Sequence, residues 1–143
     1  MTAGNAVQRK FTILPDAQAA AVEAAARLIS RIDANNGRPA ICLTGGSGPR
    51  LLYTLLGSSD YHGRIPWDRV HWFIGDERFV SEADDRNNMA AATEIFLSRC
   101  APAANIHAIP TNADDPDTAA RLSERELQTF YGSSRFDPAK PLF

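Results

Sequence analysis

The sequence has 143 residues, of which 44% are hydrophobic and 22% charged, a composition that is ordinary for one folded domain and argues against disorder. Fifteen Lys and Arg residues against seventeen Asp and Glu leave a net charge of −2, so no general positive field attracts nucleic acid or a membrane, and an anion must be bound by a local arrangement. No apolar stretch approaches the roughly 20 residues that cross a bilayer, and no signal-peptide pattern is present, so we expect a cytoplasmic protein.

The first predicted element is a helix from about Asp16 to Asn35, with Asp16 as its N-cap and Asn36-Gly37 as its stop signal. Its apolar face repeats at helical spacing through Ala17, Ala21, Ala24, Leu28 and Ile32. A buried strand is then predicted from Pro39 to Thr44. A glycine-rich loop and a short helix from Leu51 to Leu56 follow it, which makes a strand, loop and helix unit.

The second half of the chain repeats this alternation. A strand rich in β-forming residues is predicted from Arg69 to Gly75, and a polar loop from Asp76 to Asn88 leads into a helix that ends near Cys100. The expected inner face of that helix carries Met89, Ala92, Phe96 and Cys100. A third strand is predicted from Asn105 to Ile109. Asp115 and Pro116 then begin a last helix with Ala120, Leu127, Phe130 and Tyr131 on one side.

Strands that alternate with helices predict an α/β fold, a three-layer Rossmann-like and mostly parallel sheet with helices on both faces. The absence of a linker or repeat indicates a single domain over residues 1–143. Asp137 to Phe143 is typical of the lead-in to another strand, and a parallel sheet that stopped there would leave an exposed edge. We therefore expect the N-terminal part of a longer domain, truncated at the C-terminus.

The loop from Gly45 to Pro49 lies between a strand and a helix, where phosphate sites form in α/β proteins. Glycines let backbone N–H groups approach an oxyanion, and Ser47 adds a hydroxyl donor. Arg50 opposes the helix dipole in the first helical turn, a conflict that a bound anion would remove. The alternative is a tight turn with Arg50 in water. The full dinucleotide and Walker patterns are both missing.

The acidic loop after the second strand offers another set of ligand groups. Asp76 and Glu77 are adjacent, so in extended chain they point to opposite sides, and we expect one to be functional and the other structural. Arg78 can bind a phosphate or carboxylate through two parallel hydrogen bonds. The alternative is a solvated loop with an internal ion pair. Asp84 or Asp85 is the expected cap of the following helix.

Histidine and cysteine residues give no catalytic or metal-binding pattern. His71 lies within a buried strand and is expected to be a hydrogen-bonded core residue, while His62 and His107 have no carboxylate at a suggestive spacing. Cys42 and Cys100 lie in apolar contexts without metal-ligand spacing, and we expect both to be reduced core thiols.

Three segments together resemble the 6-phosphogluconolactonase family, within the wider group that includes glucosamine-6-phosphate deaminases. They are Leu43 to Pro49, Trp72 to Val80 and Asp84 to Asn88, in matching order and approximate spacing. Gly48 departs from the usual Gly-Gly-Ser-Thr-Pro loop of that family. The Asp-Glu-Arg sequence is similar to the lactonases, since the deaminases typically have Asp-Glu-Tyr. The Gly-x-Asp-Gly-His segment that supplies the family's histidine base does not occur in this sequence.

The resemblance implies hydrolysis of 6-phospho-D-glucono-1,5-lactone to 6-phosphogluconate in the pentose phosphate pathway, with this chain carrying the phosphate-binding half-site. It implies that Gly45, Gly46 and Ser47 cradle the phosphate and that Arg78 contacts phosphate or substrate hydroxyls. Asn88, rather than Asn87, would face the substrate. Asp76 would orient the substrate or the missing base.

No metal, cofactor, nucleic acid or membrane partner is implied, and a monomer is favoured. Two alternatives stay open: a glucosamine-6-phosphate deaminase or isomerase, and a non-catalytic fragment that binds sugar phosphates.

Overall fold

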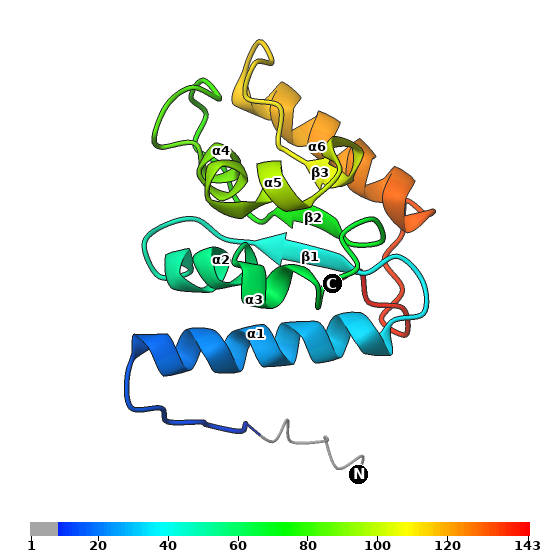
Figure 1. Cartoon of the computed structure of the whole chain (residues 1–143). Coiled ribbons are helices and arrows are strands. Elements are labelled where there is room, and N and C mark those ends of the chain that lie inside the picture. The colour runs from blue at the N-terminus through cyan, green and yellow to red at the C-terminus, as the bar shows by residue number, and fades with distance from the viewer. Residues whose placement is uncertain (1–8) are drawn as a thin grey trace.

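The computed structural model describes residues 9–143 and contains a three-stranded parallel sheet with helices on both faces (Figure 1). The strands are β1 (Ala40–Leu43), β2 (His71–Ile74) and β3 (Ile106–His107), in the order β1-β2-β3. Ile41 pairs with Trp72 and Trp72 with Ile106, which fixes the register. Because parallel strands end at the same sheet edge, the loops after β1 and β2 lie side by side. The predicted α/β class is confirmed.

One face of the sheet carries the main apolar core. Leu43, Trp72 and Ile74 point to this face. They are covered by α2 (Arg50–Leu56) and by the helical segment that follows α4, where α4 is Asn88–Ala92. Outside α2 lies α1 (Ala17–Ala34), which runs below α2 and the short α3 (Ser59–His62) in Figure 1. Trp72 is fully buried and packs edge-on against the ring of Phe96.

The other face of the sheet is covered by α6 (Pro116–Tyr131). Phe130 on α6 packs against the rings of His71, Phe73 and His107. Cys42 shares this face but is exposed, so the expectation that it is a core thiol is wrong. Cys100 is partly buried, and both thiols are free. Although Cys42 is exposed, partial desolvation of its thiol raises the pKa, and the nearby Asp76 raises it further.

Local capping explains the helix ends. Asp16 accepts a hydrogen bond from the Ala19 amide at 2.7 Å, and Asp115 accepts one from the Thr118 amide at 2.6 Å, so both predicted N-caps are confirmed. Gly132 ends α6 in the left-handed conformation with φ 81°. Within α1 and α6, the buried faces lie partly one residue away from the predicted ones. The buried residues are Ala21, Ala25, Ile29 and Ile32 in α1 and Ala119, not Ala120, in α6.

The helix predicted to end near Cys100 consists of three consecutive parts. These are α4, a π-helical segment (Thr93–Leu97) and α5 (Ser98–Cys100). Phe96 and Leu97 in the π-helical segment are both buried in the core. A single 3-10 turn (Ala103–Asn105) leads into β3.

Candidate functional site

The loop after β1 is fixed by a buried tyrosine on α2. The Tyr53 hydroxyl accepts a hydrogen bond from the Thr44 amide at 3.0 Å and donates one to the Thr44 carbonyl at 2.8 Å. Burial raises the pKa of this hydroxyl, so it remains a donor at neutral pH. Gly46 has φ 85°, a conformation that side chains disfavour. The glycine loop is therefore held in one shape at Thr44, and this shape requires glycine at position 46.

Gly45 is in close contact with the loop after β2. A Cβ atom at this position would overlap the side-chain amide of Asn88, whose nitrogen donates to the Asp76 carbonyl at 3.2 Å. Gly48, in contrast, has open space around the position that a Cβ would take. The two glycines therefore differ in role, because only Gly45 allows the close approach of the two loops.

Glu77 is the structural member of the acidic pair. Its Oε1 accepts hydrogen bonds from the backbone N–H groups of Arg78 at 2.8 Å and Asn88 at 2.6 Å, and its Oε2 accepts from Met89 at 2.9 Å. The carboxylate thus satisfies the first amides of α4 and connects this helix to the end of β2. One structural carboxylate was expected in this pair, and the structure identifies it as that of Glu77.

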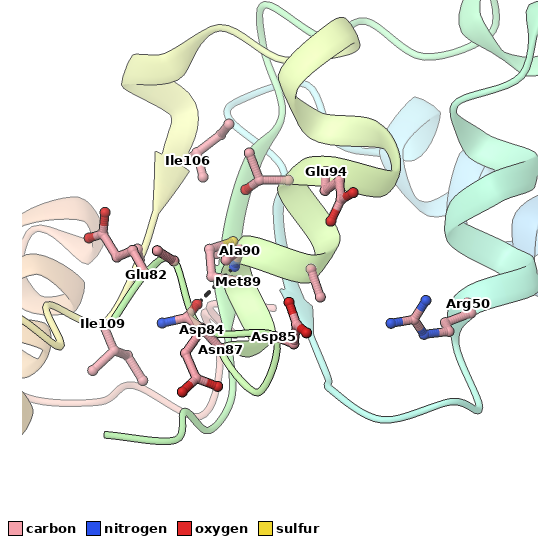
Figure 2. A pocket seen from close by; sticks show the side chains of 14 residues that line it. Arg50, Glu82, Asp84, Asp85, Asn87, Met89, Ala90, Glu94, Ile106 and Ile109 are labelled. Atoms are coloured by element: carbon pink, nitrogen blue, oxygen red, sulfur yellow. Dashed lines mark hydrogen bonds between the residues drawn. The ribbon is translucent and has the colours of Figure 1, made fainter. Parts of the chain in front are cut away.

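The N-cap of α4 is Asn87, so the expectation that Asp84 or Asp85 caps this helix is wrong. The Asn87 Oδ1 accepts from the Ala90 amide at 2.8 Å, the dashed contact in Figure 2. Asn87 is buried, whereas its neighbour Asn88 lies at the wall of the cavity between the two loops. Asp84 instead binds Arg86 through two hydrogen bonds between the side chains.

The two loops enclose a cavity of about 330 Å³. Its lining includes five of the six residues expected from the sequence, namely Gly45, Gly46, Ser47, Arg78 and Asn88. Three guanidinium groups, those of Arg50, Arg78 and Arg86, also line it, against the single carboxylate of Asp85. A cavity with this charge excess and a glycine loop on one wall can bind a dianion by backbone and guanidinium donors.

Asp76, the sixth expected residue, is exposed at the carboxyl end of β2 and does not belong to this lining. The structure thus brings together the expected phosphate ligands but leaves the expected supporting carboxylate outside the cavity. Arg50 was noted from the sequence for its position, whereas Arg86 was not among the expected site residues. The sequence signal for both is a basic residue at a loop that precedes a helix: Arg50 directly follows the glycine loop, and Arg86 lies near the end of the acidic loop.

A larger cavity of about 680 Å³ adjoins the first one (Figure 2). The carboxylates of Glu82, Asp84, Asp85 and Glu94 line it, and Arg50 is its single lining guanidinium. Figure 2 shows Arg50 reaching from α2 toward Asp85. Because the carboxylates outnumber the guanidinium, a phosphate is repelled from this cavity and favoured in the smaller one.

The histidines lie away from the cavity. His62 on α3 stacks on the Trp67 ring. His71 Nδ1 lies 2.8 Å from His107 Nε2, and His107 Nδ1 lies 2.6 Å from Glu126 Oε1. The sequence shows no carboxylate at a suggestive spacing from His107, but in the fold Glu126 reaches it from α6. His71 is a hydrogen-bonded residue of the sheet, as expected.

Residues 9–143 carry neither a metal-binding cluster nor a membrane-spanning helix. Within this range, no cluster of three or more His, Cys, Asp or Glu side chains is arranged to hold a metal ion. None of the helices in the same range has both the length and the hydropathy required for a membrane span.

Comparison with known proteins places this geometry in a family. A family model described as glucosamine-6-phosphate isomerases/6-phosphogluconolactonase matches residues 15–139. A 6-phosphogluconolactonase from Nostoc sp. is 35% identical over 132 residues, which cover 90% of this chain and 53% of that protein.

Two solved structures are similar in fold. The crystal structure of a devB protein superposes with a TM-score of 0.81 at 28% identity, covering 92% of this chain and 54% of that one. A 6-phosphogluconolactonase from Thermotoga maritima gives a TM-score of 0.72 at 25% identity, covering 88% and 56%. The chain therefore spans about half the length of these relatives. It belongs to the glucosamine-6-phosphate isomerase/6-phosphogluconolactonase family.

Proposed function

We propose that this chain supplies the phosphate-binding half-site of a 6-phosphogluconolactonase, which hydrolyses 6-phospho-D-glucono-1,5-lactone in the pentose phosphate pathway. The observation that carries the proposal is the 330 Å³ cavity in which the glycine loop meets three guanidinium groups. The Nostoc relative named 6-phosphogluconolactonase supports the choice of substrate within the family.

In this proposal, the backbone N–H groups of Gly45 and Gly46 and the Ser47 hydroxyl donate hydrogen bonds to the phosphate oxygens. Arg78 adds charge-assisted hydrogen bonds to the phosphate or to neighbouring hydroxyl groups. Asn88 is held next to Gly45 and presents its amide to the sugar. These contacts fix the position of the lactone by its phosphate, away from the bond that is cleaved.

Lactone hydrolysis requires a base that activates water for attack on the carbonyl carbon. It also requires donors that stabilise the negative charge that develops on the carbonyl oxygen. None of the three histidines, all of which lie in the described residues, lines the cavity. We therefore assign substrate binding to this chain and place the base outside the described cavity lining. Asp76 is proposed to orient that base, since it is exposed at the same sheet edge.

Calorimetric titration of the 143-residue chain with 6-phosphogluconate tests the binding role. Gly46→Val should abolish binding, because a branched side chain at φ 85° distorts the loop and its Cβ enters the open space above it. Helix content, measured by circular dichroism, should barely change. Equal affinity of the variant and the parent for 6-phosphogluconate would show that the loop is only a turn.

A further inference from the structure

Arg86 brings a third guanidinium to the cavity, and the family resemblance left this residue without a role. Arg50 is the first residue of α2, whereas Arg78 and Arg86 lie near opposite ends of the loop between β2 and α4. Two carboxylates, that of Asp85 in the lining and that of Asp84 bonded to Arg86, stand against the three guanidinium groups. One positive charge is left in excess, which a bound anion would balance.

The side chain of Arg86 is oriented by Asp84. Arg86 Nε donates to Asp84 Oδ1 at 2.9 Å and Nη2 donates to Oδ2 at 2.8 Å, which is the planar two-bond pairing of a guanidinium with a carboxylate. The Arg86 backbone N–H also donates to Oδ1 at 2.9 Å. Both the backbone and the side chain of Arg86 are therefore set by the same carboxylate.

This pairing leaves donors for a ligand. A guanidinium carries five N–H donors, and Asp84 accepts from two of the Arg86 nitrogens along one edge of the group. Nη1 and the second N–H of Nη2 remain for a ligand. The Arg86 side chain is 72% exposed, so it can contact a ligand that enters from solvent. Since Arg86 lowers the pKa of Asp84 to about 2, the pair stays ionised near neutral pH.

We propose that Arg86 is a further binding residue for the substrate phosphate and that Asp84 is its positioning residue. The proposal rests on the proposed function, because it assumes that the cavity binds a sugar phosphate. It extends that function by giving the loop before α4 a direct part in recognition of the dianion. It also explains why Asp84 pairs with Arg86 and leaves the capping of α4 to Asn87.

The test is a set of calorimetric titrations with 6-phosphogluconate and with gluconate, which lacks the phosphate. Arg86→Ala should weaken 6-phosphogluconate binding by about 10-fold or more, as expected for a charge-assisted bond, and should leave gluconate binding unchanged. Arg86→Lys should restore part of the affinity. Arg121→Ala on α6 removes the same charge away from the cavity and should bind like the parent.

Asp84 is tested by combining the substitutions. Asp84→Ala should weaken 6-phosphogluconate binding less than Arg86→Ala does, and the double variant should bind no more weakly than Arg86→Ala alone. Parent-like affinity of Arg86→Ala overturns the proposal. Tighter binding by Asp84→Ala, or an equal effect of Asp84→Ala with and without Arg86, overturns the positioning role.

The same titrations separate this proposal from the function on which it rests. If the parent chain binds 6-phosphogluconate and Gly46→Val does not, the proposed function stands whatever Arg86 does. If the parent does not distinguish 6-phosphogluconate from gluconate, the proposed function itself is wrong. Melting temperatures of the Arg86 variants, measured by circular dichroism, should match the parent, because the Arg86 side chain is exposed.

Discussion

Gly45 and Gly48 belong to one loop but meet different surroundings, and this difference provides a matched pair of variants. Gly45→Ala should weaken 6-phosphogluconate binding, because the added methyl group displaces the Asn88 amide from its bond to the Asp76 carbonyl. Gly48→Ala should bind like the parent, since its Cβ meets open space. Equal affinities of the two variants, measured by calorimetry, would contradict the role given to the contact between Gly45 and Asn88.

Arg78 is expected to bind the substrate through the planar shape of its guanidinium group as well as through its charge. Arg78→Ala should weaken 6-phosphogluconate binding by about 1.5–3 kcal/mol, the usual value for a hydrogen bond to a charged group. Arg78→Lys should recover only part of this, because an ammonium group cannot form two parallel bonds. Full recovery by lysine would show that Arg78 acts only through its charge.

Single residues of the site were predictable from the sequence where a local pattern exists. The glycine loop and Arg78 follow directly from their positions after two strands, and the cavity indeed includes both. The role of Glu77 was not predictable, because its carboxylate binds amides 11 and 12 residues away. The cap formed by Asn87 is local, but Asp84 and Asp85 nearby are equally good capping residues, so the sequence does not show which of the three caps α4.

At the scale of elements, Glu77 connects β2 to the N-terminus of α4. Glu77→Ala should lower the free energy of unfolding by about 2 kcal/mol, because it leaves backbone N–H groups of Asn88 and Met89 without their acceptor. Urea denaturation measures this change. Glu82→Ala removes an exposed carboxylate from the same loop and should have little effect. Equal denaturation midpoints for the two variants would contradict the capping role.

The contact between α6 and the sheet should depend on pH through His71. Burial, the neighbouring His107 and Arg38 all lower the pKa of His71 from 6.5, while Glu126 on α6 faces His107. The unfolded chain therefore binds a proton at His71 more readily than the folded chain. Stability from this group is complete above pH 6.5 and is lost as the pH falls below that value toward the folded-state pKa.

His71→Asn should reduce the fall in melting temperature between pH 7.5 and about pH 5 relative to the parent. His62→Asn on α3 provides the control, because His62 stacks on Trp67 and lies apart from His71 and His107. Its melting temperature should fall with pH as much as that of the parent. An unchanged slope in His71→Asn would show that the pH dependence arises elsewhere.

The elements themselves were predicted best where local capping defines them. The helices α1 and α6 begin at their predicted residues because Asp16 and Asp115 bond to amides three positions ahead. The strand from Pro39 to Thr44 was predicted too long, since strand ends depend on pairing with neighbours and β1 covers only Ala40–Leu43. The pair of His107 and Glu126 joins residues 19 apart and has no local signal.

At the scale of the whole molecule, substrate binding and catalysis are expected to be separable. The cavity holds donors for a phosphate, but its lining includes no histidine, and the chain spans about half the length of its relatives. The 143-residue chain should therefore release acid from fresh 6-phosphogluconolactone no faster than the spontaneous rate. A positioned base typically contributes 10²–10⁴-fold, so its presence would be obvious. Turnover that disappears in His62, His71 or His107 variants would contradict this expectation.

The central claim is that the cavity between the two loops binds the phosphate of a sugar phosphate. An NMR titration of the ¹⁵N-labelled chain with 6-phosphogluconate tests it most directly, because each backbone amide reports its own contacts. The account predicts saturable shifts at Gly45, Gly46 and Ser47 that gluconate does not produce. Shifts confined to the acidic cavity around Glu82 and Glu94, or equal responses to both ligands, would contradict it.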